Sequence, residues 1–124
     1  MTFITEKMVQ AYDFWVEIKM QYMTSIFSRL FGKSVNLRSI HQHGAVIVDV
    51  RSPKEFSGGH IDGALNIPLD QLSKYIGELQ QKGKPVITCC LSGGRSASAT
   101  NLLSQAGLEV YNGGGWSSLE RTLR

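Results

Sequence analysis

Residues 45–50 read Ala45-Val46-Ile47-Val48-Asp49-Val50, a run of apolar, mostly β-branched side chains broken by one aspartate. Such runs are typical of strands that are buried on both faces of a parallel sheet. A helix start follows directly, because Ser52, Pro53 and Glu55 match a capping box with proline at the first helical position. This stretch therefore predicts a buried strand followed by a short helix that ends at Gly58 and Gly59.

The alternation of strand and helix patterns continues along the rest of the chain. We expect further strands at residues 64–67, 85–90 and 108–111, and helices at 37–43, 95–106 and from 117 onward. Another helix is expected to carry Leu72, Tyr75, Ile76 and Leu79 on one face and to stop at Gly83. This repeated alternation predicts an α/β domain with a largely parallel sheet.

Composition indicates one globular domain without a nucleic-acid surface. The chain has 124 residues, of which 42% are hydrophobic and 19% charged, and its net charge is +3. This length allows one domain with a hydrophobic core and is short for two. Lysine and arginine form no basic stripe, so no nucleic-acid partner is expected. The small positive charge is compatible with anionic small substrates.

The two cysteines, Cys89 and Cys90, are neighbours in the chain. Adjacent cysteines rarely form a disulfide, and their spacing lacks the separated pairs of a zinc site. The sequence therefore predicts neither a disulfide framework nor a metal site. A reducing compartment suits two free thiols, so we expect a cytoplasmic protein.

The first 34 residues lie outside the strand and helix alternation. Apolar side chains recur there at nearly helical spacing, at Met8, Tyr12, Trp15, Tyr22, Ile26 and Leu30. We expect residues 1–34 to be an amphipathic helical extension that packs on the domain at 35–124 or allows self-association. Scattered charges argue against a secretory signal and a transmembrane helix, and the polar face has too few Lys and Arg residues to favour membrane association. Met23 is an alternative start of translation.

The residues with reactive chemistry are concentrated where the strand at 85–90 ends. Ligands of open α/β sheets bind beyond the carboxyl ends of the strands, where Cys90 lies. The turn that follows consists of Leu91, Ser92, Gly93, Gly94 and Arg95. Its glycines let backbone amides converge on an anion, and a helix N-terminus together with the Arg95 charge should lower the pKa of Cys90. We interpret Cys90 as a nucleophile and the turn as its substrate-binding loop, although such a cysteine can also be a small buried hydrophobe.

Four segments in this order resemble the rhodanese family. They are residues 49–56, residues 59–68, Cys90 to Ser96, and Gly113-Gly114-Gly115-Trp116. The resemblance, which covers about Val35 to the C-terminus, implies a five-stranded, mainly parallel sheet flanked by helices on both faces. It also implies that Cys90 takes up sulfane sulfur as a persulfide and passes it to cyanide or a thiol. Thiosulfate, a persulfide or a polysulfide would be the donor, and no cofactor is implied.

Several residues of these motifs are expected to be structural. Asp49, Arg51 and Glu55 are interpreted as support for the loop, and the resemblance implies that Arg51 pairs with Glu55. His60 is expected to bond to the backbone rather than act as a general base. Trp116 is expected to anchor the last helix in the core rather than line the substrate site.

Two other functions compete with the sulfurtransferase. The loop also resembles that of the cell-cycle dual-specificity phosphatases, which is one residue longer; the four residues between Cys90 and Arg95 form a ring that should be too small for a phosphate. The second alternative is a non-enzymatic module that senses sulfur or redox state or binds a partner, a class that usually lacks the cysteine. In the rhodanese family, which the chain resembles, more cationic loops favour thiosulfate as the donor. Leu91 and Gly94 add no such charge, so the resemblance implies that thiosulfate is a poor donor here.

Cys89 is predicted to take no part in the chemistry. Side chains alternate across a strand, so Cys89 and Cys90 should point to opposite faces of the sheet. Cys89 should then lie beneath a covering helix, where burial raises the pKa of a thiol and suppresses its reactivity.

Overall fold

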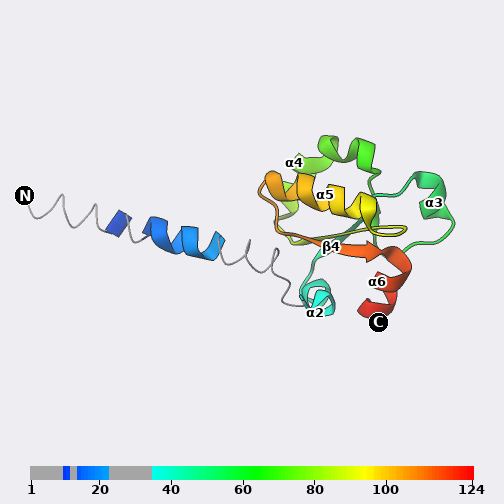
Figure 1. Cartoon of the computed structure of the whole chain (residues 1–124), viewed down its shortest axis with the longest axis horizontal. Helices are drawn as coiled ribbons and strands as arrows, with labels where there is room; N and C mark the ends of the chain where they lie inside the picture. Colours follow the sequence, from blue (N-terminus) through cyan, green and yellow to red (C-terminus); the bar gives the residue numbers. More distant parts are fainter. Residues whose placement is uncertain (1–9, 12–13, 23–34) are drawn as a thin grey trace, which may run out of the picture. The chain divides into compact units, whose positions relative to one another are not determined.

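The computed structural model describes residues 10–11, 14–22 and 35–124, and the chain divides into two compact units, Met1–Val35 and Asn36–Arg124 (Figure 1). In the first unit, residues 10–11 and 14–22 are helical, and Trp15 and Tyr22 of the expected apolar face lie exposed within 14–22. The other predicted apolar positions, Met8, Tyr12, Ile26 and Leu30, fall outside the described residues. No helix in the described ranges is long and apolar enough to cross a membrane.

The second unit is built on a parallel sheet. Its strands are β1 (Val46–Asp49), β2 (Leu65–Asn66), β3 (Val86–Cys90) and β4 (Val110–Gly115), in the order β2-β1-β3-β4. All three neighbouring pairs are parallel, as predicted. The register pairs Asp49 of β1 with Cys89 of β3, so these two strands end side by side.

The expected fifth strand is wrong for the described part of the chain, which has four. The four strand-like runs of the sequence supply these four strands. Before β1, the chain enters helix α2 (Leu37–Gln42) instead of joining the sheet. Asn36 caps α2, because its side chain accepts a hydrogen bond from Ser39 N.

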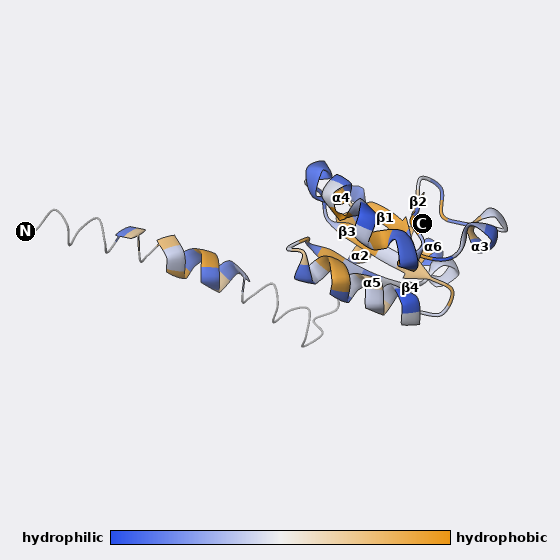
Figure 2. Cartoon of the chain, turned by 90° about the horizontal axis from the view of Figure 1, so that it is seen from above, coloured by the Kyte–Doolittle hydropathy of each residue, from blue (hydrophilic) through white to orange (hydrophobic). Residues whose placement is uncertain are grey.

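Helices cover both faces of the sheet (Figure 1). Helices α4 (Ile76–Lys82) and α5 (Gly94–Gln105) lie on one face, and α2 and α6 (Trp116–Leu123) lie on the other. Each face has its own apolar core: Leu79, Ala99 and Leu103 pack with the strands on the first, and Leu119 packs with them on the second. The strands between these layers are among the most hydrophobic segments of the domain (Figure 2).

Two elements differ from the sequence prediction. The helix expected to carry Leu72 and Leu79 consists of a 3₁₀ helix, η1 (Leu69–Tyr75), followed by α4. At its start, Gln71 N donates to Pro68 O, and Leu69 N donates to the carbonyl of Val50, the residue that follows β1.

Strand β4 is longer than predicted because it continues through three glycines. A Cβ at Gly113 would lie only 2.7 Å from both Thr88 O and the Leu119 side chain, so this close packing requires glycine. Glycine has a low strand propensity, which explains why the end of β4 was missed.

Candidate active site

The loop from Cys90 to Arg95 connects β3 to α5, as the sequence predicted. Gly93 caps α5 with a φ of +108°, a left-handed conformation that favours glycine. This conformation turns the backbone amide of Gly93 toward the thiol, and Gly93 N donates to Cys90 Sγ at 3.0 Å. The loop therefore wraps its own backbone donors around the cysteine sulfur.

The Cys90 thiol is buried at the base of this loop, between the apolar core beneath α5 and the loop's polar groups. The residue is only 1% exposed, and Ser96 Oγ lies 3.4 Å from its sulfur. Burial alone would raise the pKa of Cys90. The hydrogen bond with the Ser96 hydroxyl and those from the backbone amides of Ser96, Gly93 and Ser92 outweigh burial, so the pKa is lowered below its ordinary value.

Ser96 was quoted in the sequence motif but was not predicted as a partner of the thiol. Its buried hydroxyl donates to Gly93 O at 3.0 Å and accepts a hydrogen bond from Cys90 Sγ at 3.4 Å. Its carbonyl accepts hydrogen bonds from Thr88 Oγ1 at 3.1 Å and Thr100 Oγ1 at 2.8 Å. These bonds fix the first turn of α5 to β3, and they thereby fix the Ser96 hydroxyl beside Cys90.

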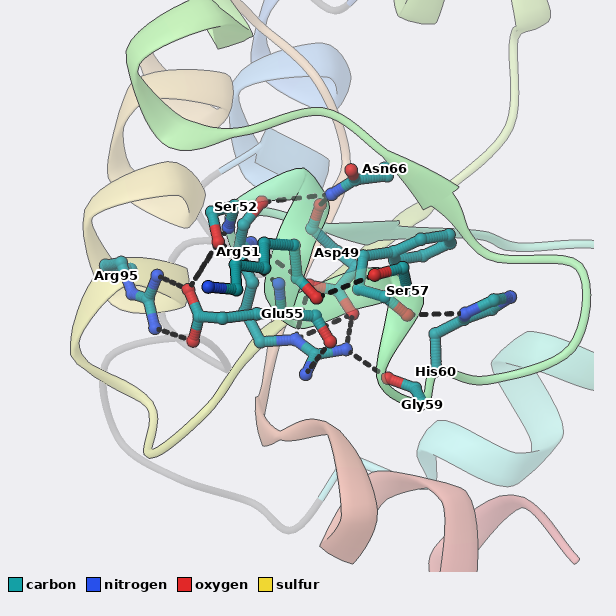
Figure 3. Close-up of polar contacts among 11 residues, drawn as sticks. Asp49, Arg51, Ser52, Glu55, Ser57, Gly59, His60, Asn66 and Arg95 are labelled. Atoms are coloured by element: carbon teal, nitrogen blue, oxygen red, sulfur yellow. Dashed lines mark hydrogen bonds and ion pairs between the residues drawn. The ribbon is translucent and has the colours of Figure 1, made fainter.

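Arg95 forms a two-point ion pair with Glu55 (Figure 3). Nη1 and Nη2 of Arg95 donate to the two Glu55 carboxylate oxygens at 2.7 and 2.9 Å. The Arg95 hydrogen bond, followed by one from Ser52 N, lowers the pKa of Glu55 to about 2. Arg95 also interacts electrostatically with Cys90, but hydrogen bonds contribute more to the lowered pKa of the thiol. The loop's hydrogen-bond donors thus have the larger role in lowering the pKa of Cys90, whereas the sequence predicted that the helix N-terminus and the Arg95 charge would lower it.

Arg51 pairs with Asp49 rather than with the Glu55 carboxylate, so the implied Arg51–Glu55 pair is wrong. Arg51 Nε donates to Asp49 Oδ1 at 3.0 Å and Nη2 to Oδ2 at 2.8 Å, and both side chains are buried. Arg51 reaches only the backbone carbonyl of Glu55, at 3.3 Å, because the Glu55 carboxylate faces Arg95. Its guanidinium also donates to Gly59 O at 2.7 Å and lies 4.8 Å from the Trp116 ring.

Asn66 is a second residue that sequence reasoning missed. Its Nδ2 donates to Asp49 O at 3.1 Å and to Arg51 O at 3.0 Å, so the end of β2 holds the turn after β1 (Figure 3). The sequence signal that could have identified Asn66 is an amide side chain at the end of the strand expected next to residues 45–50. Asn66 therefore belongs to the scaffold around the loop.

The structural interpretations of two aromatic residues are supported. His60 Nδ1 bonds to Phe56 O at 2.8 Å, and the centroids of the two rings lie 3.7 Å apart in a stacked arrangement. The His60 ring therefore stabilises the turn after α3 (Pro53–Ser57).

The predicted capping box at the start of α3 is confirmed, because Ser52 and Glu55 each accept a hydrogen bond from the other's backbone amide. Trp116 packs against the core on the α6 side and covers Arg51.

Cys89 is buried on the opposite face of the sheet, as predicted. It belongs to the core beneath Leu119, whereas Cys90 belongs to the core beneath Ala99. Burial, reinforced by the nearby Asp49 charge, raises the pKa of Cys89 to about 12.

A groove of about 650 Å³ lies beside the Cys90 loop. Arg95 of the loop, Ser52 and Pro53 of α3, and the start of η1 line it. The full lining is Val50, Ser52, Pro53, Pro68, Leu69, Asp70, Gln71 and Arg95.

Comparison with known proteins gives a consistent result. The family model "Rhodanese-like domain" matches residues 35–121. The thiosulfate sulfurtransferase GlpE of Pseudomonas aeruginosa is 30% identical over 102 residues, covering 82% of this chain and 90% of GlpE. The uncharacterized protein YqhL of Bacillus subtilis is 46% identical over 69 residues, and the match spans about half of each protein, 55% of this chain and 54% of YqhL. The structure of the human single-domain sulfurtransferase TSTD1 aligns with a TM-score of 0.56 at 32% identity, covering 66% of this chain and 87% of TSTD1.

Proposed function

Because the chain belongs to the rhodanese-like domain family, we propose that it is a sulfurtransferase that carries sulfur as a persulfide on Cys90. The observation that carries the proposal is the Cys90 thiol at the end of β3, whose pKa is lowered by the surrounding donors. A thiolate is the nucleophilic form of cysteine, so a lowered pKa increases the reactive fraction of Cys90 at a given pH. Relatives named as sulfurtransferases, GlpE and TSTD1, support the same activity.

Uptake of sulfur from thiosulfate illustrates the first half-reaction. The Cys90 thiolate attacks the outer sulfur, a new S–S bond forms at Cys90, and sulfite leaves with the electrons of the broken S–S bond. The product is a Cys90 persulfide anion. The amide of Gly93 and the Ser96 hydroxyl, which contact Sγ in the resting site, are placed to stabilise sulfur that carries negative charge.

The second half-reaction returns the thiolate. Cyanide or a thiolate attacks the terminal sulfur of the persulfide, and the Cys90 thiolate leaves. With cyanide the product is thiocyanate. No electrons are exchanged with another reagent, so this chemistry uses cysteine and the loop donors and requires no cofactor. A reducing, cytoplasmic compartment suits it, because a reactive thiolate oxidises readily.

The remaining motif residues support the loop in this proposal. Leu91 to Arg95 form the substrate loop, the Arg95–Glu55 pair connects its end to α3, and the buried Arg51–Asp49 pair holds the turn after β1. We place this machinery in a domain at residues 35–124, with residues 1–34 as a separate helical extension.

Steady-state thiocyanate formation tests the proposal. Cys90→Ser should reduce the rate to background, because serine cannot form a persulfide, while the urea unfolding transition stays cooperative. Cys89→Ala is the matched control, one residue away, and should keep a rate close to wild type. Thiocyanate formation by Cys90→Ser at the wild-type rate would overturn the proposal.

A further inference from the structure

Arg95 is the only charged side chain in the loop from Cys90 to Arg95. Its side chain is 39% exposed and lines the groove beside the loop, so a solute can reach it. It also interacts electrostatically with Cys90 at the other end of the loop. A planar guanidinium binds two oxygens of a carboxylate or another oxyanion at once. Arg95 is therefore the cation of the loop that an anion approaching Cys90 would meet.

Glu55 occupies this anion-binding position in the structure (Figure 3). Nη1 and Nη2 of Arg95 donate to the two carboxylate oxygens of Glu55 at 2.7 and 2.9 Å. Both terminal nitrogens of the guanidinium are thus bonded to a carboxylate that comes from α3, and the ion pair has no net charge. An incoming anion must displace Glu55 to obtain the same two bonds.

Further hydrogen bonds keep the Glu55 carboxylate in this position. Ser52 N and Ser52 Oγ donate to Glu55 Oε1 at 3.2 and 3.1 Å, so the capping box of α3 holds the same oxygen that Arg95 Nη1 binds. The Arg95 hydrogen bond, followed by that of Ser52 N, lowers the pKa of Glu55 to about 2. The carboxylate is therefore ionised at neutral pH and competes with other anions for Arg95.

We propose that Glu55 determines donor specificity by occupying the anion-binding position on Arg95, so that reactants that carry negative charge are disfavoured at Cys90. The inference rests on the proposed sulfur transfer and concerns the donors that the loop accepts. A dianion such as thiosulfate finds the Arg95 charge cancelled, and the Glu55 charge repels it. A donor without charge is affected by neither side chain in this way. Glu55 is thus a specificity-determining residue of the loop, although it lies in α3.

Two alkylating reagents that differ in charge test this proposal on Cys90. Iodoacetamide is neutral and iodoacetate is an anion, and in both cases the same thiolate displaces iodide. The ratio of their second-order rate constants therefore does not depend on the ionised fraction of Cys90. Wild type should react with iodoacetate no faster than with iodoacetamide. Glu55→Gln frees Arg95 and keeps an oxygen for the capping box, so it should raise the iodoacetate-to-iodoacetamide ratio about five- to tenfold.

Asp70→Asn is the matched control, because Asp70 is a second carboxylate in the groove lining and binds Gln71. Loss of this charge should change the ratio less than about twofold, since it leaves the Arg95–Glu55 pair in place. The double variant Glu55→Gln with Arg95→Gln should return to the wild-type ratio, because no guanidinium remains to bind the anion.

Three results would overturn the proposal. They are an unchanged ratio in Glu55→Gln that unfolds cooperatively, an equal rise in Asp70→Asn, and a rise that persists in the double variant. A wild-type preference for iodoacetate would overturn it too, and that measurement needs no substitution, so it applies even where Glu55→Gln folds poorly.

Thiosulfate extends the test to the proposed reaction. The rate constant for uptake of sulfur by Cys90 from thiosulfate, divided by the iodoacetamide rate constant, should rise in Glu55→Gln by a similar factor. A higher alkylation ratio with no sulfur on Cys90 from thiosulfate or polysulfide would contradict the proposed function and support the role of Glu55. Sulfur on Cys90 with unchanged ratios would support the proposed function and contradict the role of Glu55.

Discussion

Cys89 and Cys90 are neighbours in one strand, and their pKa values are shifted in opposite directions. Cys89 lies in the core beneath α6, and its pKa is raised to about 12. Cys90 lies in the core beneath α5, where burial is outweighed by hydrogen-bond donors and the pKa is lowered. Both side chains are almost fully excluded from solvent. The two thiols therefore differ in what surrounds them: hydrogen-bond donors at the start of α5 lower the pKa of Cys90, whereas burial and the Asp49 charge raise the pKa of Cys89.

Of the substitutions that test the comparison of Cys89 with Cys90, removal of the Asp49 charge should have the largest effect. In Asp49→Asn the buried Arg51 loses its carboxylate, which should cost about 3–5 kcal/mol of unfolding free energy. The pKa of Cys89 should fall, because burial would then act without the Asp49 charge and with Arg51 unopposed. Urea unfolding and alkylation of Cys89 as a function of pH measure the two effects.

The matched control for this prediction is Glu55→Gln, which removes the carboxylate of the partly exposed Arg95–Glu55 pair. Exposed pairs contribute little to stability, so the loss should be much smaller. An equal loss in the two variants would show that burial of the Arg51–Asp49 pair is not what makes it important.

Ser96→Ala should reduce the pKa difference between the two cysteines by raising the pKa of Cys90. Without the Ser96 hydroxyl, the Cys90 thiolate loses a hydrogen-bond donor, so its pKa should rise and its reactivity at neutral pH should fall. The pH midpoint of iodoacetamide alkylation measures this shift. Ser98→Ala, on the exposed side of the same helix, should leave the midpoint unchanged. A midpoint that stays at the wild-type value in Ser96→Ala would contradict the role given to the hydroxyl.

Cys89→Ala should have a smaller effect. Loss of the buried sulfur should cost about 1 kcal/mol near neutral pH and leave sulfur transfer close to wild type. The raised pKa adds a pH dependence: stability due to the neutral Cys89 thiol is complete below the pKa of an unfolded cysteine, about 8.5, and decreases as pH rises toward about 12.

Urea unfolding between neutral and alkaline pH measures this dependence. Wild type should lose up to about 1.4 kcal/mol per pH unit above pH ~8.5 through Cys89, a loss that Cys89→Ala lacks. Identical alkaline slopes in the two proteins would show that Cys89 ionises as easily in the folded protein as in the unfolded one.

Deletion of residues 1–22 should have the smallest effect. The family match begins at residue 35, and both cysteines and every contact of the site lie after it. We therefore expect the truncated protein to keep its thiocyanate rate and to unfold within about 0.5 kcal/mol of wild type. Loss of cooperative unfolding would show that the N-terminal unit completes the core.

The sequence predicted those parts of the structure that depend on local patterns. The apolar run at 45–50, the Ser52–Glu55 capping box and the alternation of Cys89 and Cys90 across β3 are local, and each is found in the structure. The partners of charged side chains depend on long-range packing. Both Asp49 and Glu55 are close to Arg51 in the sequence, so the sequence does not determine which carboxylate Arg51 binds. Arg95 lies forty positions from Glu55 in the sequence, and the fold brings the two side chains together.

The missed elements have the same origin. At Gly113 in β4, Thr88 O and the Leu119 side chain lie too close to leave room for a Cβ. This long-range packing is not part of any strand propensity scale. Asn66 and Ser96 acquire their roles from neighbours across the sheet and the loop. Only the family resemblance implies a fifth strand, since the sequence contains four strand-like runs. The described part of the chain has four strands.

Intact-mass analysis after exposure to a persulfide donor tests most directly the claim that Cys90 alone carries the sulfur. Wild type, Cys89→Ala and Cys90→Ser are treated alike, and the labelled peptide is mapped. Wild type and Cys89→Ala should each gain the mass of one sulfur atom, located on Cys90, and Cys90→Ser should gain none. A sulfur atom on Cys89 in the Cys90→Ser protein, or two sulfur-bearing cysteines in wild type, would contradict the account.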